Sequence, residues 1–396
     1  MSVVAVVGAG AMGSGIAQVA AVAGERVQVY DARAGAARAG VEQVASRLQR
    51  QVDKQRMPAA DATAATERLT AVDNLAELDA ADLVVEAIVE SLEVKRCVFA
   101  DLEQVCRPET VLATNTSTLS VTDIAAALRH RGRVCGMHFF NPAPLMRLVE
   151  VPVGADTDPV VADRVSGWAT AWGKTAVRCA STPGFIVNRV ARPYYGEAQR
   201  IVEEGVAGPA AVDASMRAVG FRMGPFELAD LIGNDVNLAS ATSVWEQTGH
   251  DPRYEPTVSQ RRLVETGDLG RKSGRGWYDY PRPDSSAVGH REPPEQPQTD
   301  PRSDVSDRIV AMLVNEAAAL VDRKEAGAAD VDTAMRLGTN YPFGPLEHGD
   351  VWGPAAVLDV LASLHERFPT GRYRPADRLV RSAAHGTSLR ADTPSP

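Results

Sequence analysis

The chain has 396 residues, of which 44% are hydrophobic and 23% are charged, so it has the composition of a globular protein with room for two or three domains. The formal net charge of −9 argues against a nucleic-acid binder or a polybasic membrane surface. No apolar run approaches the roughly 18 residues of a membrane span, and the first one, Val3–Val7, lacks the basic flank of a signal peptide, so we expect a cytoplasmic protein without a membrane partner.

Four cysteines lie far apart in the sequence and show no CxxC spacing. A metal site or a disulfide framework would need clustered cysteines, so neither is indicated. We expect buried thiols in a reducing compartment. The four are Cys97, Cys106, Cys135 and Cys179.

Residues 1–182 alternate short β-branched runs with longer helical stretches, the pattern of βαβ units in a parallel sheet. The first run is apolar throughout, as in a strand that is covered on both faces. The expected strands are Val3–Val7, Val27–Asp31, Leu83–Ile88, Val111–Thr114, Val134–Phe139, Leu148–Val153 and Thr175–Cys179, with a polar helical stretch from about Ala34 to Gln55. The sequence therefore predicts an α/β domain.

The first strand runs directly into a GxGxxG element, Gly8-Ala9-Gly10-Ala11-Met12-Gly13. Alone this motif is weak, but here a helical run follows it and a second strand ends in an acidic residue, which together form a dinucleotide-binding fingerprint. The glycines allow a tight turn, close approach of a diphosphate, and close helix packing, and the helix N-terminus favours the negative charge. We expect Gly8, Gly10, Met12 and Gly13 to line the cofactor. The alternative is a glycine turn in a sheet protein that binds nothing.

Asp31 ends the second strand and is expected to accept hydrogen bonds from both hydroxyls of the adenosine ribose. Its negative charge would repel a 2′-phosphate, so NAD is predicted in preference to NADP. Arg33 weakens this preference, because an arginine two residues further on could stack on the adenine or meet a phosphate.

His138 closes the strand that begins at Val134, and Glu150 lies among apolar residues in the next strand. A carboxylate in such surroundings is costly unless it is paired, and a histidine is its natural partner. The carboxylate would fix the imidazole tautomer and raise its pKa, giving a general base for an alcohol proton while hydride leaves the carbon. The alternative, a core histidine and a surface glutamate, fits the spacing equally well.

The loop Asn115-Thr116-Ser117-Thr118-Leu119-Ser120 follows another strand, where loops at the carboxyl ends of a parallel sheet line the ligand crevice. We expect Asn115 beside the cofactor and Ser117 on the reacting oxygen. Ser120 is a candidate N-cap for the helix that begins at Val121.

From residue 183 the strands stop, and residues 183–280 predict a helical domain with helices at Gly184–Gly205, Pro209–Val219 and Pro225–Thr248. Residues 281–304 hold six prolines among polar residues and predict a linker. Residues 305–385 repeat the helical domain: the segment from Asn188 recurs from Asp307 at a constant offset of 119, and after one inserted residue Gly224-Pro225 recurs as Gly344-Pro345. The tail from Ala384 is expected to be disordered.

The repeat also singles out Asn188. An asparagine inside an apolar helical turn needs a partner, and the second copy has Asp307 in its place. Since the duplicated scaffold folds without this asparagine, we interpret Asn188 as functional and the second copy as catalytically silent. We expect the two copies to pack on each other within one chain, and a homodimer through another surface stays open.

In combination, these residues resemble the 3-hydroxyacyl-CoA dehydrogenase family. The matching segments, spread over residues 1–280, are GAGAMGSGIAQ, NTSTLS, GMHFFNPAPLMRLVEV, STPGFIVNRV, MGPFELADLIG and GRKSGRGWYDY. The tandem copy is most similar to that of the bacterial dehydrogenases of phenylacetate catabolism, which are thought to oxidise 3-hydroxyadipyl-CoA. The resemblance implies a Rossmann-type NAD-binding domain followed by two tandem all-α helical domains.

The resemblance also implies the chemistry: NAD-dependent oxidation of a short-chain (S)-3-hydroxyacyl-CoA to the 3-oxoacyl-CoA. His138 would be the base and Glu150 its partner, while Ser117 and Asn188 would hold the substrate oxygen. Further positions match the NAD site of the family, namely Glu90, Lys95, Asn141 and Lys272, and Lys54 matches a position that contacts CoA. No metal is implied.

Three alternatives remain open at this level. The substrate could instead be 3-hydroxybutyryl-CoA of fatty-acid metabolism (β-oxidation), or a free β-hydroxy acid. The chain could also be a non-catalytic relative that only binds NAD. For a substrate with a terminal carboxylate, Arg147, Arg189 and Arg192 are candidate partners by proximity in sequence alone.

Overall fold

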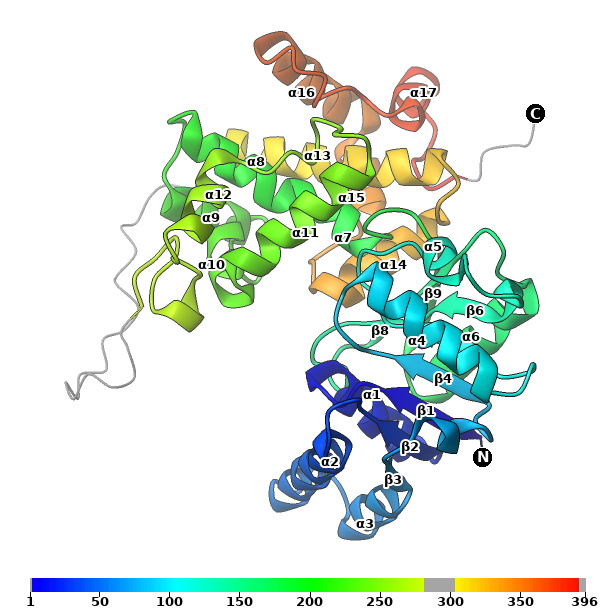
Figure 1. Cartoon of the computed structure of the whole chain (residues 1–396). Coiled ribbons are helices and arrows are strands. Elements are labelled where there is room, and N and C mark those ends of the chain that lie inside the picture. Colours follow the sequence, from blue (N-terminus) through cyan, green and yellow to red (C-terminus); the bar gives the residue numbers. More distant parts are fainter. Residues whose placement is uncertain (1, 281–302, 392–396) are drawn as a thin grey trace, which may run out of the picture. The chain divides into compact units, whose positions relative to one another are not determined.

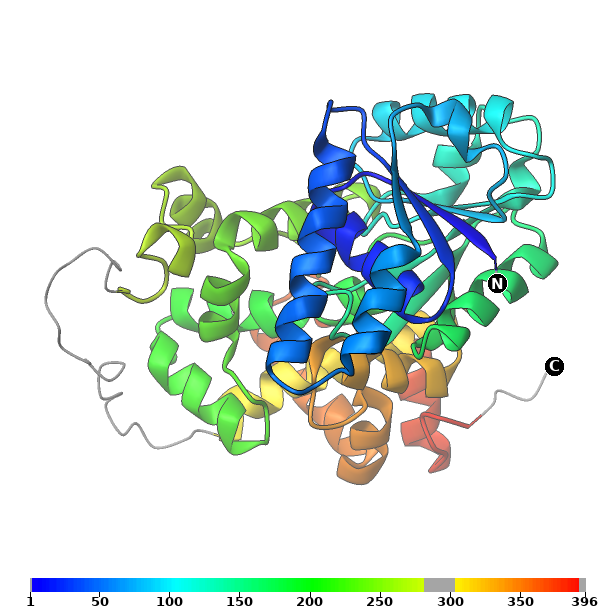
Figure 2. The same cartoon turned by 90° about the horizontal axis from the view of Figure 1, so that it is seen from below.

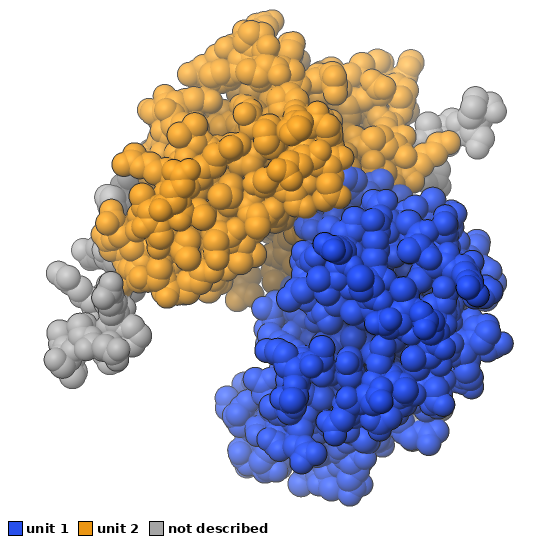
Figure 3. Space-filling view, viewed as in Figure 1, with its two compact units in different colours: residues 1–185 blue, residues 186–396 orange. Residues whose placement is uncertain are grey.

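The computed structural model describes residues 2–280 and 303–391, and the chain divides into two compact units, residues 1–185 and 186–396 (Figure 3). Most of the predicted linker, residues 281–302, lies outside the described residues. Its last two positions were predicted wrongly, because Ser303 and Asp304 already belong to a helix.

The first unit is built on a six-stranded parallel sheet with the order β3-β2-β1-β4-β5-β6 (Figure 1). The order reverses between β1 and β4, where the crevice of such sheets binds ligands. The strands are β1 (Val3–Val7), β2 (Arg26–Tyr30), β3 (Leu69–Val72), β4 (Leu83–Glu86), β5 (Val111–Thr114) and β6 (Val134–Gly136). Among these strands only β3 was not predicted from the sequence.

Helices cover both faces of this sheet. Alternate residues of β1 enter different cores, with Val4 and Val6 on one side and Ala5 and Val7 on the other, which confirms a strand buried on both faces. The helices are α1 (Ala11–Val22), α2 (Ala36–Asp53), α3 (Ala59–Glu67), α4 (Leu92–Val105), α5 (Val121–Ala125) and α6 (Pro159–Ala171). Figure 2 shows α1, α2 and α3 packed side by side.

A second sheet of three strands corrects the predicted parallel arrangement. Its order is β7-β8-β9, with β7 (His138–Phe139) antiparallel to β8 (Leu148–Val153) and β8 parallel to β9 (Thr175–Ala180). The predicted strand Val134–Phe139 is divided after Gly136. Only eight residues join β7 to β8, too few for the crossover that a parallel pair needs.

The second unit is helical in its described part. The first copy contains α7 (Val187–Val190), α8 (Arg192–Glu203), α9 (Pro209–Ala218), α10 (Pro225–Ile232), α11 (Asn234–Gln247) and α12 (Val258–Glu265). Pro225 lies in the first turn of α10, as predicted. The predicted helix Pro225–Thr248 is two helices, because Gly233 adopts φ +109 between them.

The second copy contains α13 (Ser303–Asp322), α14 (Ala328–Thr339), α15 (Pro345–Trp352), α16 (Pro354–Arg367) and α17 (Asp377–His385). The prediction of a disordered tail from Ala384 was wrong up to Ala391. Leu389 is fully buried, and its backbone accepts a hydrogen bond from Arg378. In the described part of the chain, no helix is both long and apolar enough to span a membrane.

The two copies share a capping contact. Asp213 accepts the backbone N–H groups of Phe226 and Glu227 at the start of α10, at 3.0 and 3.1 Å. Asp332 accepts those of Leu346 and Glu347 at the start of α15, at 2.8 and 3.0 Å. The repeated contact shows that the sequence repeat is a repeated structural unit.

The copies pack on each other through α8 and α13, and buried ion pairs join them with an approximate two-fold relation. Arg189 donates to Glu316 at 3.0 Å, while its counterpart Arg308 donates to Glu197 at 2.9 Å. The hydroxyl groups of Tyr254 and of its counterpart Tyr373 donate to the same two glutamates. Each residue lies 119 positions before its counterpart, so the two faces of the interface are versions of one surface.

Three of the four cysteines are buried, as predicted. Burial raises the pKa of Cys106 to about 11 and that of Cys135 to about 12, so these thiols stay protonated. The prediction was wrong for Cys97, which is exposed on α4.

Candidate active site

The glycines of the first loop have the steric roles that the fingerprint predicts. A Cβ on Gly13 would lie 1.7 Å from the carbonyl oxygen of Gly8, and Gly8 itself adopts φ +103 with a Cβ position 2.6 Å from the oxygen of Ala87. A Cβ on Gly10 would meet nothing within 4 Å. Gly10 therefore borders open space.

The N-terminus of α1 has no side-chain cap, because Gly10 occupies the N-cap position. Its first-turn N–H groups and the helix dipole are thus available to an anionic group. Met12 is half-buried and packs against the core instead of projecting freely. Together with the space above Gly10, the uncapped helix fits the diphosphate of a dinucleotide.

Asp31 follows β2 and touches the same loop. Its Oδ2 accepts the backbone N–H of Ala9 at 2.8 Å, while Arg33 donates to both carboxylate oxygens. Burial raises the pKa of Asp31, but the hydrogen bonds from Arg33 and Ala9 hold that pKa below its ordinary value. The carboxylate is therefore ionised at neutral pH.

His138 and Glu150 face each other directly across the antiparallel pair β7–β8. Their side chains lie on the same face of the sheet, and Nδ1 of His138 is 2.7 Å from Oε2 of Glu150. Glu150 is fully buried and His138 nearly so. The predicted pairing is confirmed, and an Nδ1–H that donates to the carboxylate leaves Nε2 as the basic nitrogen.

Aromatic rings surround the imidazole. The ring of Phe140 lies 4.6 Å from that of His138, and the ring of Phe185 lies 5.7 Å away. These apolar neighbours limit the movement of the imidazole and exclude water from its sides.

Glu90 organises the loop that carries Ser117. Its Oε1 accepts the Thr116 hydroxyl at 2.6 Å, the Ser117 N–H at 2.9 Å and the Thr118 N–H at 3.1 Å. Burial raises the pKa of Glu90, but the charge of Lys95 and these hydrogen bonds outweigh that effect and lower it. Glu90, predicted to line the cofactor site, therefore acts in this structure as an ionised clamp on the loop.

Lys95 holds Glu90 in place through an ion pair. It is almost completely buried, and its Nζ lies 2.6 Å from Glu86 and 3.3 Å from Glu90. Glu86 was not among the predicted site residues, although its position at the carboxyl end of β4, next to apolar residues, was a signal in the sequence. Glu86 also accepts the Thr114 hydroxyl at 2.7 Å, which joins two strand ends.

Asn115 connects the loop to the strand of the histidine. Its Oδ1 accepts the backbone N–H of Phe139 at 2.8 Å. Ser120 caps α5 as predicted, since its Oγ accepts the N–H of Asp123 at 3.1 Å. Asn141, predicted at the cofactor, is exposed in the segment after β7.

The structure thus places several predicted residues of the first unit in direct contact, namely Asp31 with the fingerprint loop, Glu90 with Ser117 and Lys95, and His138 with Glu150. Asn188 and Lys272 belong to the second unit. Asn188 is half-buried on α7, and its backbone carbonyl accepts Nε of Arg192 at 2.7 Å. Lys272 pairs with Asp235, with Nζ 2.5 Å from Oδ1.

Two of the three arginines considered for a substrate carboxylate have structural roles. Arg189 is buried against Glu316 and Glu325, and Arg192 is buried against Asn237 and the ring of Tyr195. Arg147, between β7 and β8, is exposed.

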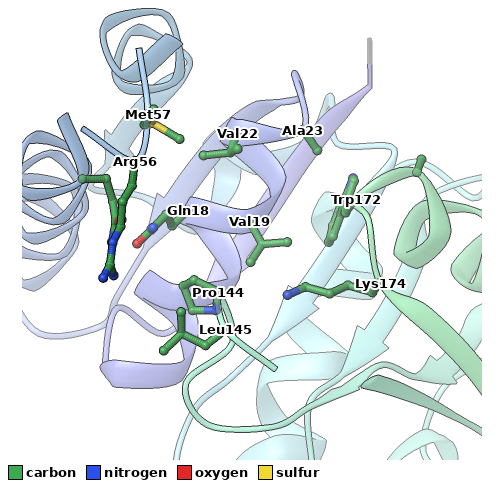
Figure 4. Close-up of a pocket in the computed structure, with 12 residues that line it drawn as sticks. Gln18, Val19, Val22, Ala23, Arg56, Met57, Pro144, Leu145, Trp172 and Lys174 are labelled. Atoms are coloured by element: carbon green, nitrogen blue, oxygen red, sulfur yellow. The ribbon is translucent and has the colours of Figure 1, made fainter. Parts of the chain in front are cut away.

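A hollow of about 340 Å³ lies in the first unit, between the second half of α1, the end of α2 and the segment before β8 (Figure 4). Its lining includes Gln18, Arg56, Leu145, Trp172 and Lys174. Arg56 is cationic, and Nζ of Lys174 donates to the backbone oxygens of Ala143 and Met146 at 2.6 and 2.8 Å, so Arg56 is the positive charge that the hollow offers to an anionic group.

Two further cationic side chains, Lys54 and Arg47, lie on α2 or at its end, outside the lining of this hollow. Lys54 is exposed at the end of the helix. The Nε and Nη2 atoms of Arg47 are buried without a hydrogen-bond partner among the described residues, and burial together with Arg50 lowers the pKa of Arg47. Arg47 was not predicted as a site residue, because the burial of its side chain depends on how α2 packs.

Family models match nearly the whole chain. The model described as "3-hydroxyacyl-CoA dehydrogenase, NAD binding domain" matches residues 3–182. The model described as "3-hydroxyacyl-CoA dehydrogenase, C-terminal domain" matches twice, at residues 184–280 and 305–392.

Similar proteins carry related names. A "3-hydroxyadipyl-CoA dehydrogenase" of Escherichia coli is 38% identical over 96% of this chain and 97% of its own length. A "Probable 3-hydroxybutyryl-CoA dehydrogenase" of Bacillus subtilis is 44% identical over 69% of this chain and 96% of its own length. A crystal structure of an E. coli protein called 3-hydroxybutyryl-CoA dehydrogenase superposes with a TM-score of 0.89 at 38% identity, covering 97% of this chain and 98% of that one.

Proposed function

Because the chain belongs to the 3-hydroxyacyl-CoA dehydrogenase family, we propose that it oxidises the 3-hydroxyl of a short-chain (S)-3-hydroxyacyl-CoA to a ketone. The observation that carries this proposal is the buried pair of His138 and Glu150, with Nδ1 2.7 Å from the carboxylate. No other pair in the first unit combines an imidazole with a fully buried carboxylate among the described residues.

In this reaction His138 takes the hydroxyl proton on Nε2. Glu150 keeps the imidazole in the required tautomer and stabilises the imidazolium ion that forms. The fully buried position of Glu150 strengthens this stabilisation, since few solvent dipoles screen the pair. In the reverse direction the same imidazolium returns the proton to the carbonyl oxygen.

Ser117 holds the reacting oxygen, and the clamp of Glu90 on its loop fixes the position of the serine. We assign Asn188 to the same oxygen, because the second copy keeps the helix but has Asp307 at the corresponding position. That difference supports a functional role and a silent second copy.

NAD, when bound, accepts the hydride from C3 of the substrate. Residues of this chain suited to hold it are the backbone of Gly8, Gly10 and Gly13, the uncapped start of α1, and Asp31 for the ribose. Glu90, Lys95 and Asn115 support the loop next to this position, and Asn141 and Lys272 complete the proposed set.

The phosphate-bearing end of CoA is assigned to the cationic end of α2. Lys54 is exposed there, and the partly buried guanidinium of Arg47 has donors without acceptors. A buried, unpartnered arginine is costly unless a ligand supplies an anion. The hollow lined by Arg56 adds positive charge for the same phosphate-bearing group.

For the acyl group we propose 3-hydroxyadipyl-CoA, the substrate named for a relative that is 38% identical over 96% of this chain. This substrate would place the chain in phenylacetate catabolism and not in general β-oxidation. Since 3-hydroxybutyryl-CoA is named for other relatives, it is the second candidate.

Initial rates of NADH formation with both CoA thioesters and with free 3-hydroxyadipate test the proposal. We expect kcat/KM for the adipyl thioester to exceed that for the butyryl thioester at least a hundredfold, about 2.7 kcal/mol of transition-state binding. Equal values would leave a general short-chain dehydrogenase. A preference for the free acid, or NADH binding without turnover of any thioester, would overturn the proposal.

A further inference from the structure

Arg33 saturates the carboxylate that the cofactor ribose needs. Its backbone N–H and Nε donate to Oδ1 of Asp31 at 3.0 and 3.1 Å, and its Nη2 donates to Oδ2 at 3.3 Å. The N–H of Ala9 occupies the remaining place on Oδ2 at 2.8 Å. A carboxylate accepts about four hydrogen bonds, so Asp31 has no acceptor position left for a ribose hydroxyl.

These four contacts differ in how easily they are replaced. The two backbone donors belong to the main chain of the loop and the turn, so rotation of a side chain cannot remove them. The guanidinium, in contrast, is 76% exposed, whereas Asp31 is 10% exposed. A ribose must therefore displace the two side-chain donors of Arg33, and an exposed pair of this kind is weak.

The displaced guanidinium also changes the charge that a cofactor meets. An aspartate alone rejects a 2′-phosphate by repulsion, but here a positive charge lies within hydrogen-bond distance of the negative one. Once it is released from Asp31, the guanidinium is a donor suited to the phosphate group. The same residue thus weakens the binding of a free ribose and favours a phosphorylated one.

We propose that Arg33 is a specificity-determining residue of the cofactor site, which competes with the adenosine ribose for Asp31 and reduces discrimination against NADP. This inference concerns the cofactor alone and does not depend on the acyl substrate. It predicts that the chain prefers NAD over NADP by a smaller factor than a variant that keeps Asp31 but lacks the arginine at position 33.

Equilibrium binding tests it without the reaction. Dissociation constants of NADH and NADPH are measured by fluorescence titration for the wild type, Arg33→Ala and Arg33→Lys. Arg38→Ala, another exposed arginine of the same region, is the matched control. Because Arg33 is exposed, its variants should fold, and thermal melting checks this.

We expect Arg33→Ala to bind NADH more tightly and NADPH more weakly, so that the ratio of the two constants rises about tenfold. Arg33→Lys should fall between alanine and wild type, since it keeps the charge but not the two-pronged contact. Arg38→Ala should leave the ratio unchanged. A ratio within twofold of wild type in Arg33→Ala, or an equal loss of both cofactors as expected for stacking on adenine, would overturn the proposal.

Discussion

The pairing of His138 with Glu150 follows from the register of two short strands. The residues face each other directly in β7 and β8, so their side chains meet on one face of the sheet. The sequence predicted the pair from the cost of an acidic residue among apolar ones, while expecting the strands to be parallel. The burial of Glu150 can be predicted from its apolar neighbours in the sequence. The direction of the strand depends instead on the short connection between Phe139 and Leu148.

Glu150→Gln tests the role of the carboxylate. Glutamine has nearly the same shape but cannot stabilise an imidazolium ion, so we expect kcat to fall about 10²–10⁴-fold. NADH affinity should not change, because the residue does not touch the fingerprint loop. Glu109→Gln, an exposed control, should retain wild-type activity. Equal activity of both variants would show that the pair is only structural.

At the scale of elements, the loop after β5 depends on one carboxylate from another connection. Glu90 follows β4 and receives donors from three consecutive residues, beginning with Thr116. The sequence predicted both segments near the cofactor, because both follow parallel strands. It did not predict that the two segments bind each other. The orientation of Glu90 depends on its contact with Lys95, which in turn pairs with Glu86.

The clamp predicts a pH dependence. The pKa of Glu90 is lower in the folded chain than its ordinary value of 4.5, so its ionised form stabilises the fold above that value. This contribution is lost as the pH falls through the folded pKa. In urea unfolding, Glu90→Gln should be less stable than the wild type at pH 7, and the difference should shrink only as the pH falls below 4.5. A difference that is independent of pH, or equal to that of the exposed control Glu93→Gln, would contradict the clamp.

The capping aspartates predict unequal costs in the two copies. Asp332→Ala removes two N–H contacts at the start of α15 and should cost about 1–2 kcal/mol of unfolding free energy. Asp213→Ala also leaves the hydroxyl of Tyr278 without its acceptor, which adds about 1–3 kcal/mol. Chemical denaturation of both variants measures the difference. Equal losses would show that Tyr278 does not contribute.

Elements with strong local signals were predicted well, and short or interrupted ones were not. Strands β1 and β5 have the predicted bounds, because each is a continuous apolar run next to turn residues. Strand β3 has only four residues, two of them polar or small, and owes its place to pairing with β2. The tail after Ala384 reads as polar, and its order comes from the burial of Leu389.

At the scale of the molecule, the repeated domain packs on itself inside one chain. Arg189 and Glu197 of the first copy contact the second copy, and their counterparts Arg308 and Glu316 return the same contacts. The offset of the repeat predicted two similar domains, but not that charged residues would be buried between them. The Bacillus subtilis relative, which covers 69% of this chain, shows that a much shorter chain of this family exists. A homodimer of this chain stays a prediction.

Glu316→Gln tests the buried charges. Removal of one charge leaves Arg189 with Glu325 and Arg253 with Asp251 as their remaining partners of opposite sign, so we expect a loss of about 1–3 kcal/mol. Glu366→Gln, exposed on α16, should change stability by no more than about 0.5 kcal/mol. Thermal and urea unfolding measure both. A loss below about 1 kcal/mol in Glu316→Gln would mean that the interface does not depend on these charges.

The central claim is that His138 removes the proton while an acyl-CoA alcohol is oxidised. The most direct test is the initial rate of NADH formation from a 3-hydroxyacyl-CoA, measured for the wild type and His138→Gln at saturating NAD. We predict turnover by the wild type and a rate at least about 10²-fold lower in the variant, with unchanged NADH affinity. A variant within tenfold of the wild type, or a wild type that binds NADH and forms no product, would contradict the account.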